Sequence, residues 1–313
     1  MADRGFESEL RRYGPEADSF HVSIEEACAY CRHLASSHYE NFSVVSWLLP
    51  QNLRQHFCNV YAYCRWADDL ADESGTPSER LALLAWWRRE LLDCLAGQAR
   101  HPVFVALLPT IREFSIPESP FLALLEAFER DQRQVRYATH AEILDYCRCS
   151  ANPVGRLVLH LGRCYTQANA SLSDSVCTGL QLANFLQDVA EDFERGRIYL
   201  PQASCAEFGY TDECFQKKVV DDQWRALMSV EVNRASDYLH RGWPLVDQLP
   251  QELRFQVDLF VRGGLAILQA IRDVEYDVWT ARPTVGKLTQ LKLAAKSWLR
   301  QRVTGRRTAR DHG

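Results

Sequence analysis

The 313-residue sequence is poor in the residues that make turns, with only 15 Gly and 12 Pro. No uninterrupted apolar run reaches the roughly 18 residues that a membrane-spanning helix needs. Strict alternation of apolar and polar residues is hard to find, and there is no fixed repeat and no low-complexity linker. Hydrophobic residues make up 47% and charged residues 25%, which excludes a disordered or fibrous chain. The sequence therefore predicts a helix-rich globular protein with few loops.

The N-terminus lacks the apolar segment of a cleavable signal, since its first twenty residues are rich in charge. The eleven cysteines are an odd number. Both features predict a cytoplasmic protein with free, mostly buried thiols. A structural zinc site usually needs two CxxC pairs, so the lone pair Cys28 and Cys31 and the CxC at Cys147 and Cys149 do not favour a metal role.

The net charge of −5 gives no reason to expect binding to nucleic acid. This value is the sum of an acidic body of −12 and a basic segment of +7 from residue 287 onward. Within that segment, apolar side chains recur at helical spacing: Leu288, Leu291, Ala295, Trp298 and Leu299. Two interpretations stay open, namely peripheral contact with the inner face of the cytoplasmic membrane and packing of a basic helix on the body.

Helical periodicity dominates the chain and predicts one all-α domain. We expect an N-terminal extension over 1–22, a helical domain over 23–286 and a basic amphipathic tail over 287–313. The predicted helices lie at 23–38, 50–72, 78–96, 101–113, 119–133, 140–149, 152–169, 172–193, 222–242, 249–280 and 285–302.

An acidic stripe runs along the segment YAYCRWADDLADES, residues 61–74. On a helix, Tyr61, Arg65, Asp68 and Asp72 follow an i, i+4, i+7, i+11 spacing and share one face. Asp69 lies one position away from it. A second stripe occupies LQLANFLQDVAEDFERGRIYLP, residues 180–201, where apolar residues separate four polar ones at the same kind of spacing: Gln181, Asn184, Asp188 and Asp192.

Carboxylates flanked by apolar residues need a compensating cation, because burying them unpaired costs several kcal/mol each. Arg65 and Arg197 can neutralise only part of this charge. Mg²⁺ prefers a few carboxylate oxygens together with water and phosphate oxygens, so the two stripes predict a magnesium and phosphate site. Two solvated acidic faces are the alternative. A di-iron bundle is excluded because no histidine has Glu three residues before it.

Four segments resemble the squalene/phytoene synthase family: HYENFSVVSWLLP (38–50), YAYCRWADDLAD (61–72), YCRCSANPVG (146–155) and QLANFLQDVAEDFERGRIYLP (181–201). The resemblance covers about residues 25–290. It implies an all-α, single-domain isoprenoid synthase fold whose helices surround a central cavity, with two facing Asp-rich helices. It further implies an isoprenoid diphosphate substrate and two or three Mg²⁺ ions.

Residue by residue, the resemblance assigns Mg²⁺ and diphosphate to Asp68, Asp72, Asp188 and Asp192. It places supporting diphosphate contacts at His38, Asn41, Tyr61, Arg65, Gln181, Asn184, Arg197 and Tyr276. It makes Phe42 an aromatic cavity residue and assigns proton or cation handling to Tyr146. Outside the acidic motifs, a role in packing alone stays open for each of these residues.

Two departures from the common family pattern resemble the bacterial hydroxysqualene synthase branch: Gln187 stands where Arg is usual, and Asn152 lies in Ala151–Gly155 where the common sequence is Ala-Gly-Thr-Val-Gly. That branch ionises presqualene diphosphate and captures the cation with water, and we hypothesise that Asn152 positions this water. The resemblance implies a partner enzyme that makes presqualene diphosphate, within squalene and hopanoid synthesis.

No GxGxxG loop is present, so no NAD(P)H is expected. The alternatives are a prenyltransferase that makes presqualene diphosphate, squalene, phytoene or dehydrosqualene, and a non-catalytic scaffold relative.

Overall fold

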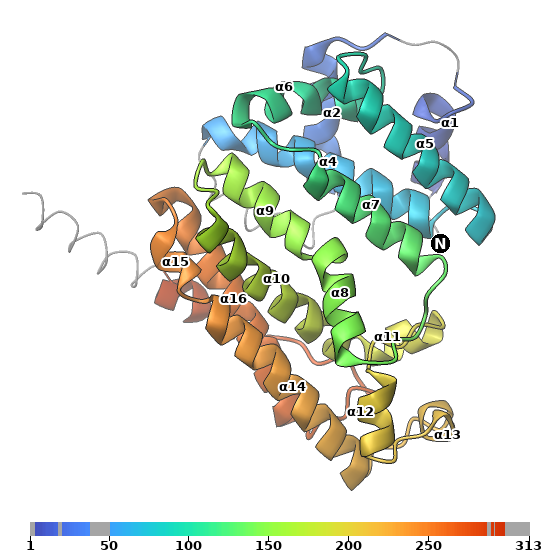
Figure 1. Ribbon diagram of the computed structural model, residues 1–313, viewed down its shortest axis with the longest axis vertical. Coiled ribbons are helices and arrows are strands. Elements are labelled where there is room, and N and C mark those ends of the chain that lie inside the picture. The colour runs from blue at the N-terminus through green and yellow to red at the C-terminus, as the bar shows by residue number, and fades with distance from the viewer. Residues whose placement is uncertain (1–3, 18–20, 38–50, 287–288, 291, 298–313) are drawn as a thin grey trace, which may run out of the picture. The chain divides into compact units, whose positions relative to one another are not determined.

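The computed structural model describes residues 4–17, 21–37, 51–286, 289–290 and 292–297. All elements labelled in Figure 1 are helices, as expected from the scarcity of Gly and Pro. The longer ones are α1 (Arg4–Tyr13), α2 (Ile24–Ser37), α4 (Gln51–Asp72), α5 (Pro77–Leu95), α6 (Pro102–Phe114), α7 (Ser119–Asp131), α8 (His140–Ser150), α9 (Asn152–Leu161), α10 (Gln167–Gln187), α14 (Asp222–Gly242) and α16 (Gln251–Asp273). Short helices are α11 (Val189–Glu194), α12 (Gln202–Glu207), α13 (Asp212–Gln216) and α15 (Leu245–Gln248).

The chain forms two compact units. Unit 1 comprises residues 1–134 and 157–163, and unit 2 comprises residues 135–156 and 164–313. The acidic stripe of α4 belongs to unit 1, and the acidic stripe that begins on α10 belongs to unit 2. None of the described helices is long and apolar enough to cross a membrane.

An aromatic core fixes the rotation of α4 in unit 1. Tyr63 and Trp66 of α4 are fully buried, and the Trp66 ring stacks on Trp87 of α5 with centroids 5.3 Å apart. The ring of His101 meets Trp66 edge-on at 4.4 Å. Burial holds the pKa of His101 well below its usual range, so the imidazole is neutral and accepts a hydrogen bond from the Val103 amide at 3.2 Å. With these rings turned inward, the stripe at positions 61, 65, 68 and 72 points away from the core.

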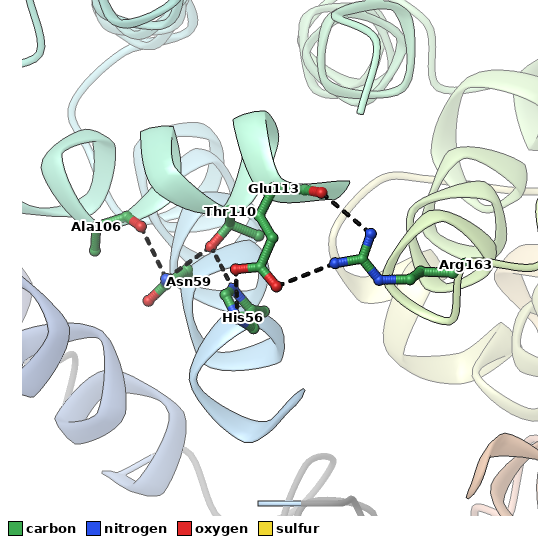
Figure 2. Close-up of polar contacts among 6 residues, drawn as sticks. All are labelled: His56, Asn59, Ala106, Thr110, Glu113 and Arg163. Atoms are coloured by element: carbon green, nitrogen blue, oxygen red, sulfur yellow. Dashed lines mark hydrogen bonds and ion pairs between the residues drawn. The ribbon is translucent and has the colours of Figure 1, made fainter. Parts of the chain in front are cut away.

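A polar network joins the first half of α4 to α6 (Figure 2). The Asn59 amide donates to the Ala106 carbonyl at 2.8 Å and to the Thr110 hydroxyl at 3.0 Å. His56 lies 3.0 Å from the same hydroxyl and 3.5 Å from the carboxylate of Glu113. Buried polar groups are nearly always hydrogen-bonded, so the network favours the observed register between the two helices.

Residues 4–13 form α1, which the sequence did not predict. Phe6 and Tyr13 are buried, and the Phe6 ring lies 5.2 Å from Trp66. The hydroxyl of Tyr30 on α2 donates to Glu9 at 2.6 Å and accepts from Trp66 Nε1 at 3.0 Å. The first part of the expected N-terminal extension is therefore an integral helix of unit 1.

In unit 2, α10 and α14 lie side by side (Figure 1). Gly179 of α10 permits this approach, because a Cβ there would lie 2.9 Å from the backbone nitrogen of Leu239. Gly242 of α14 does the same from the other side, since its Cβ would lie 2.7 Å from the Leu172 carbonyl oxygen and the Val176 nitrogen. Two small residues thus set the contact between the helices.

Three predicted boundaries were wrong. The break between 152–169 and 172–193 falls earlier, at residues 162–166: Arg163 has φ of 50°, and the Thr166 hydroxyl caps α10 by accepting from the Asn169 amide at 3.1 Å. A second break at Asp188 separates α10 from α11. The helix expected over 249–280 begins at Gln251 and already ends at Asp273, after which the left-handed residues Glu275 and Tyr276 form a turn.

All eleven cysteines are free, and six of them are buried, which confirms the expectation of unpaired thiols. Burial raises the pKa of Cys147 and of Cys64 to about 12, so both thiols are protonated and unreactive at neutral pH. Most of the predicted tail over 287–313 lies outside the described residues, together with its proposed membrane contact. Residues 289–290 and 292–297 are helical, and Ser297 is buried.

Candidate active site

The acidic stripe of α4 is built as the spacing predicted. Asp68 is half-buried and Asp72, the last residue of the helix, is exposed. Arg65 lies among the carboxylates: its guanidinium is 3.3 Å from Asp68 and 3.3 Å from Glu73, and it forms an ion pair with Asp69. Arg65 therefore contacts three acids, two of them on α4 and the third, Glu73, directly after the helix.

Asp69 departs from the stripe as its position predicted, because it is buried. Burial raises its pKa to about 7 against the opposing effect of Arg65, and the neighbouring Glu73 and Asp68 raise it further. Tyr61, also on the stripe, is half-buried, and burial raises its pKa as well. The phenol is thus a neutral hydrogen-bond donor beside the carboxylates.

The second stripe follows α10 and continues into α11. Along α10, Gln181 is half-buried and Asn184 is exposed, while the apolar residues between them are buried. The Asn184 amide donates to Asp188 at 2.6 Å. Although α10 ends before Asp188, the Asp188 amide still donates to the Asn184 carbonyl at 2.9 Å, and the Asp192 amide donates to the Asp188 carbonyl at 2.8 Å. The break therefore leaves the i, i+4 relation of Asn184, Asp188 and Asp192 in place.

Asp192 lies in a strongly perturbed environment. Burial raises its pKa to about 7, and the negative charge of Asp188 raises it further, while Arg195 and Arg197 oppose the shift. The amides of the same two arginines donate to the Asp192 carbonyl at 3.1 and 2.8 Å. The turn after α11 thus keeps Arg195 and Arg197 close to Asp192, and the phosphate contact of Arg197 stays a prediction.

Sequence reasoning missed Arg282. Its guanidinium binds both oxygens of Asp188, with Nε 2.5 Å from Oδ1 and Nη2 3.1 Å from Oδ2. Nη2 also donates to the Gln187 side chain at 3.3 Å, and Nε lies 3.6 Å from Glu191. Gln187 in turn donates to the Pro283 carbonyl at 2.6 Å. The one available signal was the unbalanced charge of the stripe, because nothing in the local sequence joins residue 282 to residue 188.

Tyr146 belongs to an aromatic cluster in unit 2. The Phe185 and Tyr199 rings stack with centroids 3.9 Å apart, and Tyr146 lies 6.0 Å from the first and 5.8 Å from the second. Tyr137 completes the cluster at 5.5 Å from Tyr146. Residues 135–138 run beside 198–203, where the amide of Ile198 donates to the Val135 carbonyl at 2.9 Å. This pairing places Tyr137 next to Tyr199.

Of the remaining predicted site residues, the structure describes Asn152 and Tyr276. Asn152 is buried, and its side-chain oxygen accepts a hydrogen bond from Thr178 at 3.0 Å. Tyr276 is half-buried with φ of 64°, and its carbonyl accepts from Trp224 Nε1 at 2.8 Å. Its contact with phosphate stays a prediction. His38, Asn41 and Phe42 lie outside the described residues.

The donor set in each unit fits magnesium. Asp68 and Asp72 on α4, and Asp188 and Asp192 in unit 2, offer the hard carboxylate oxygens that Mg²⁺ prefers. The raised pKa of Asp192 has burial and a like charge as its causes, and a divalent cation relieves both. Among the residues that the structure describes, no three His, Cys, Asp or Glu side chains are grouped to hold a metal alone.

The fold resembles that of known isoprenoid synthases. The squalene synthase HpnC from Alicyclobacillus acidocaldarius is 44% identical, with a TM-score of 0.78 over 82% of this chain and 97% of that one. A dehydrosqualene synthase solved with a ligand is 24% identical and shares the fold, with a TM-score of 0.81 over 90% of this chain and 98% of that one. The all-helical isoprenoid synthase fold is thereby confirmed.

The family follows from the sequence match. Residues 35–289 match the squalene/phytoene synthase family. The 15-cis-phytoene synthase of Synechococcus elongatus is 32% identical over 288 residues, which cover 87% of this chain and 94% of that protein. The chain belongs to the squalene/phytoene synthase family, and it is an isoprenoid synthase of the prenyltransferase type.

Proposed function

We propose that the protein is a hydroxysqualene synthase, which ionises presqualene diphosphate and captures the rearranged cation with water in squalene and hopanoid synthesis. Gln187 is the observation that carries this proposal. Its side chain is buried and bonded to Arg282 and Pro283, so a position that usually carries a guanidinium offers no charge to a second diphosphate. The 44% identity to a protein called a squalene synthase, against 32% for a phytoene synthase, also supports the squalene side of the family.

Ionisation breaks the bond between the cyclopropylcarbinyl carbon and the diphosphate oxygen, and the electron pair leaves with the diphosphate. Bound Mg²⁺ supplies the Lewis acid that neutralises this growing negative charge. Asp188 and Asp192 would hold it in unit 2, and Asp68 and Asp72 in unit 1. Asn184 fixes the orientation of the Asp188 carboxylate through its 2.6 Å hydrogen bond, as ligand-supporting residues do in metal sites.

The carbocation left behind needs a surface that stabilises it without reacting. The stacked rings of Phe185 and Tyr199, with Tyr146 beside them, offer π-faces that attract a cation. A lone pair of water then forms the new C–O bond, and the oxygen releases one proton. The balanced products are hydroxysqualene, diphosphate and a proton.

The decisive experiment incubates the pure protein with Mg²⁺ and either presqualene diphosphate or farnesyl diphosphate, with and without NADPH. We expect hydroxysqualene from presqualene diphosphate alone, and in ¹⁸O-labelled water its hydroxyl should contain the heavy oxygen by mass spectrometry. Turnover of farnesyl diphosphate by the pure protein would instead establish the prenyltransferase alternative, which the similarity to phytoene synthases favours.

Variants separate catalysis from a scaffold role. Asp188→Asn should lower kcat by about a hundredfold or more, the usual scale for removing a group that stabilises transition-state charge. Glu194→Gln on α11 is the matched control, because this exposed carboxylate pairs with Lys218 at 3.3 Å and should leave turnover unchanged. A scaffold would show no turnover, and no thermal stabilisation by Mg²⁺ with pyrophosphate.

The two sequence departures can be tested together. If Gln187 limits the site to one diphosphate and Asn152 positions water, then Gln187→Arg combined with Asn152→Gly should yield products besides hydroxysqualene. Hydroxysqualene as the sole product of this double variant would contradict both roles.

A further inference from the structure

Among the described side chains, Arg282 makes the most hydrogen bonds to the carboxylate of Asp188. Two guanidinium nitrogens bind the two oxygens of Asp188, at 2.5 and 3.1 Å, and Asn184 donates to Oδ2 at 2.6 Å. Asp188 therefore accepts three hydrogen bonds, two of them from a cation. A cation that takes an oxygen of Asp188 as a ligand competes with these bonds and is repelled by the positive charge of Arg282.

The backbone beside Arg282 is anchored independently of this pair. Gln187 donates to the Pro283 carbonyl at 2.6 Å, and both groups belong to unit 2. The Arg282 side chain is 42% exposed, whereas that of Asp188 is 16% exposed. The guanidinium can consequently leave Asp188 by side-chain rotation while residue 283 stays attached to the end of α10.

We propose that Arg282 is a diphosphate-binding residue that exchanges partners: it holds Asp188 until a magnesium ion takes that carboxylate, and it then binds the diphosphate that arrives with the metal. A guanidinium suits both partners, because its planar fork matches carboxylate and phosphate oxygens alike. The inference rests on the proposed function in one respect, namely that this site takes a diphosphate.

Two ligand titrations of the full-length protein test the exchange. For Arg282→Gln, the midpoint for stabilisation by MgCl₂ alone in a thermal scan should shift to about two- to fivefold lower concentration, because a competitor for Asp188 is gone. At saturating Mg²⁺, calorimetry should show inorganic pyrophosphate binding about tenfold or more weakly, because a charge-assisted phosphate contact is lost. The loss of Arg282 should therefore strengthen the binding of Mg²⁺ and weaken the binding of pyrophosphate.

A purely structural role for Arg282 would weaken both ligands together or leave both unchanged, and either result would overturn the inference. Arg225→Gln is the matched control: this arginine of unit 2 pairs with Asp222 at 3.4 Å and Glu275 at 3.9 Å on the surface, and it should move neither titration.

Arg282→Lys keeps the charge and covers the case in which Arg282→Gln does not fold. It should retain the MgCl₂ midpoint and weaken pyrophosphate by about threefold, because an ammonium lacks the fork; unchanged pyrophosphate affinity would count against the inference. Failure of the wild-type protein to bind pyrophosphate with Mg²⁺ would overturn the proposed function as well. Binding by the wild type with no change in either Arg282 variant would overturn only the role of Arg282.

Discussion

The contact between α10 and α14 makes Gly179 a sensitive test of how α10 is held. A Cβ at this position would lie 2.8 Å from Leu239 Cγ, 2.9 Å from its Cδ2 and 2.9 Å from its backbone nitrogen. Leu239 is fully buried, so neither its side chain nor its backbone can withdraw easily. Gly179→Ala must therefore push the two helices apart.

The magnitude follows from two opposing effects. Overpacking of this kind costs about 1–3 kcal/mol, whereas replacing Gly by Ala inside a helix recovers about 1 kcal/mol. We expect a net loss of up to about 2 kcal/mol in the free energy of unfolding and a Tm lower by up to a few degrees. Because Gln181 follows two residues later on the same helix, the displacement should also lower kcat by about tenfold.

Chemical denaturation, thermal scans and steady-state kinetics measure these effects. Gly263→Ala on α16 is the matched control, because none of the described atoms lies within 4 Å of a Cβ built there; it should stabilise the protein by about 0.5–1 kcal/mol. A Gly179→Ala protein as stable and as active as the wild type would refute the close-packing argument.

Three further predictions concern charge, register and cation stabilisation. Burial raises the pKa of Asp192 to about 7, so the charged carboxylate destabilises the fold above pH 7. Without Mg²⁺, Asp192→Asn should therefore raise the Tm above pH 7. A gain in Tm that did not become smaller at lower pH would contradict this reasoning. Asn59→Ala leaves the Ala106 carbonyl without its amide donor, and denaturation should show a loss of about 1–3 kcal/mol; an unchanged free energy would argue against the network. Tyr199→Leu removes the ring stacked on Phe185 at 3.9 Å and should slow turnover about tenfold, with extra products by mass spectrometry; wild-type rate and products would exclude a cation role.

The sequence predicted the helices best where their apolar and polar faces alternate over many turns. The bounds expected for 50–72 and 222–242 match α4 and α14 to within one residue, because burial of one face determines both the period and the rotation of such helices. Helix α1 was missed because its apolar positions, Phe6 and Tyr13, are few among charged neighbours. Only tertiary contacts with Trp66 and Tyr30 reveal its role.

In the candidate site, too, residues close together in the sequence could be predicted and a contact between distant residues could not. Asn184, Asp188 and Asp192 could be predicted as a group because all lie within three helical turns of each other. Arg282 could not, because its pairing with Asp188 depends on where a turn after α16 comes to lie. The break at Asp188 also escaped prediction, since no Gly or Pro marks it and the hydrogen bonds on either side preserve the helical spacing.

Membership of residues 157–163 in unit 1 has a consequence for synthesis of the protein. Arg163 binds the carboxylate of Glu113 at 3.2 Å and the carbonyl of the same residue at 3.3 Å (Figure 2). Its guanidinium also lies 4.5 Å from the centroid of the Phe114 ring. A ribosome must translate residues 135–156 of unit 2 before it reaches this arginine. A gene cut after codon 134 would therefore yield a fragment without this contact at the end of α6, and the first unit is complete only after the first residues of the second have been translated.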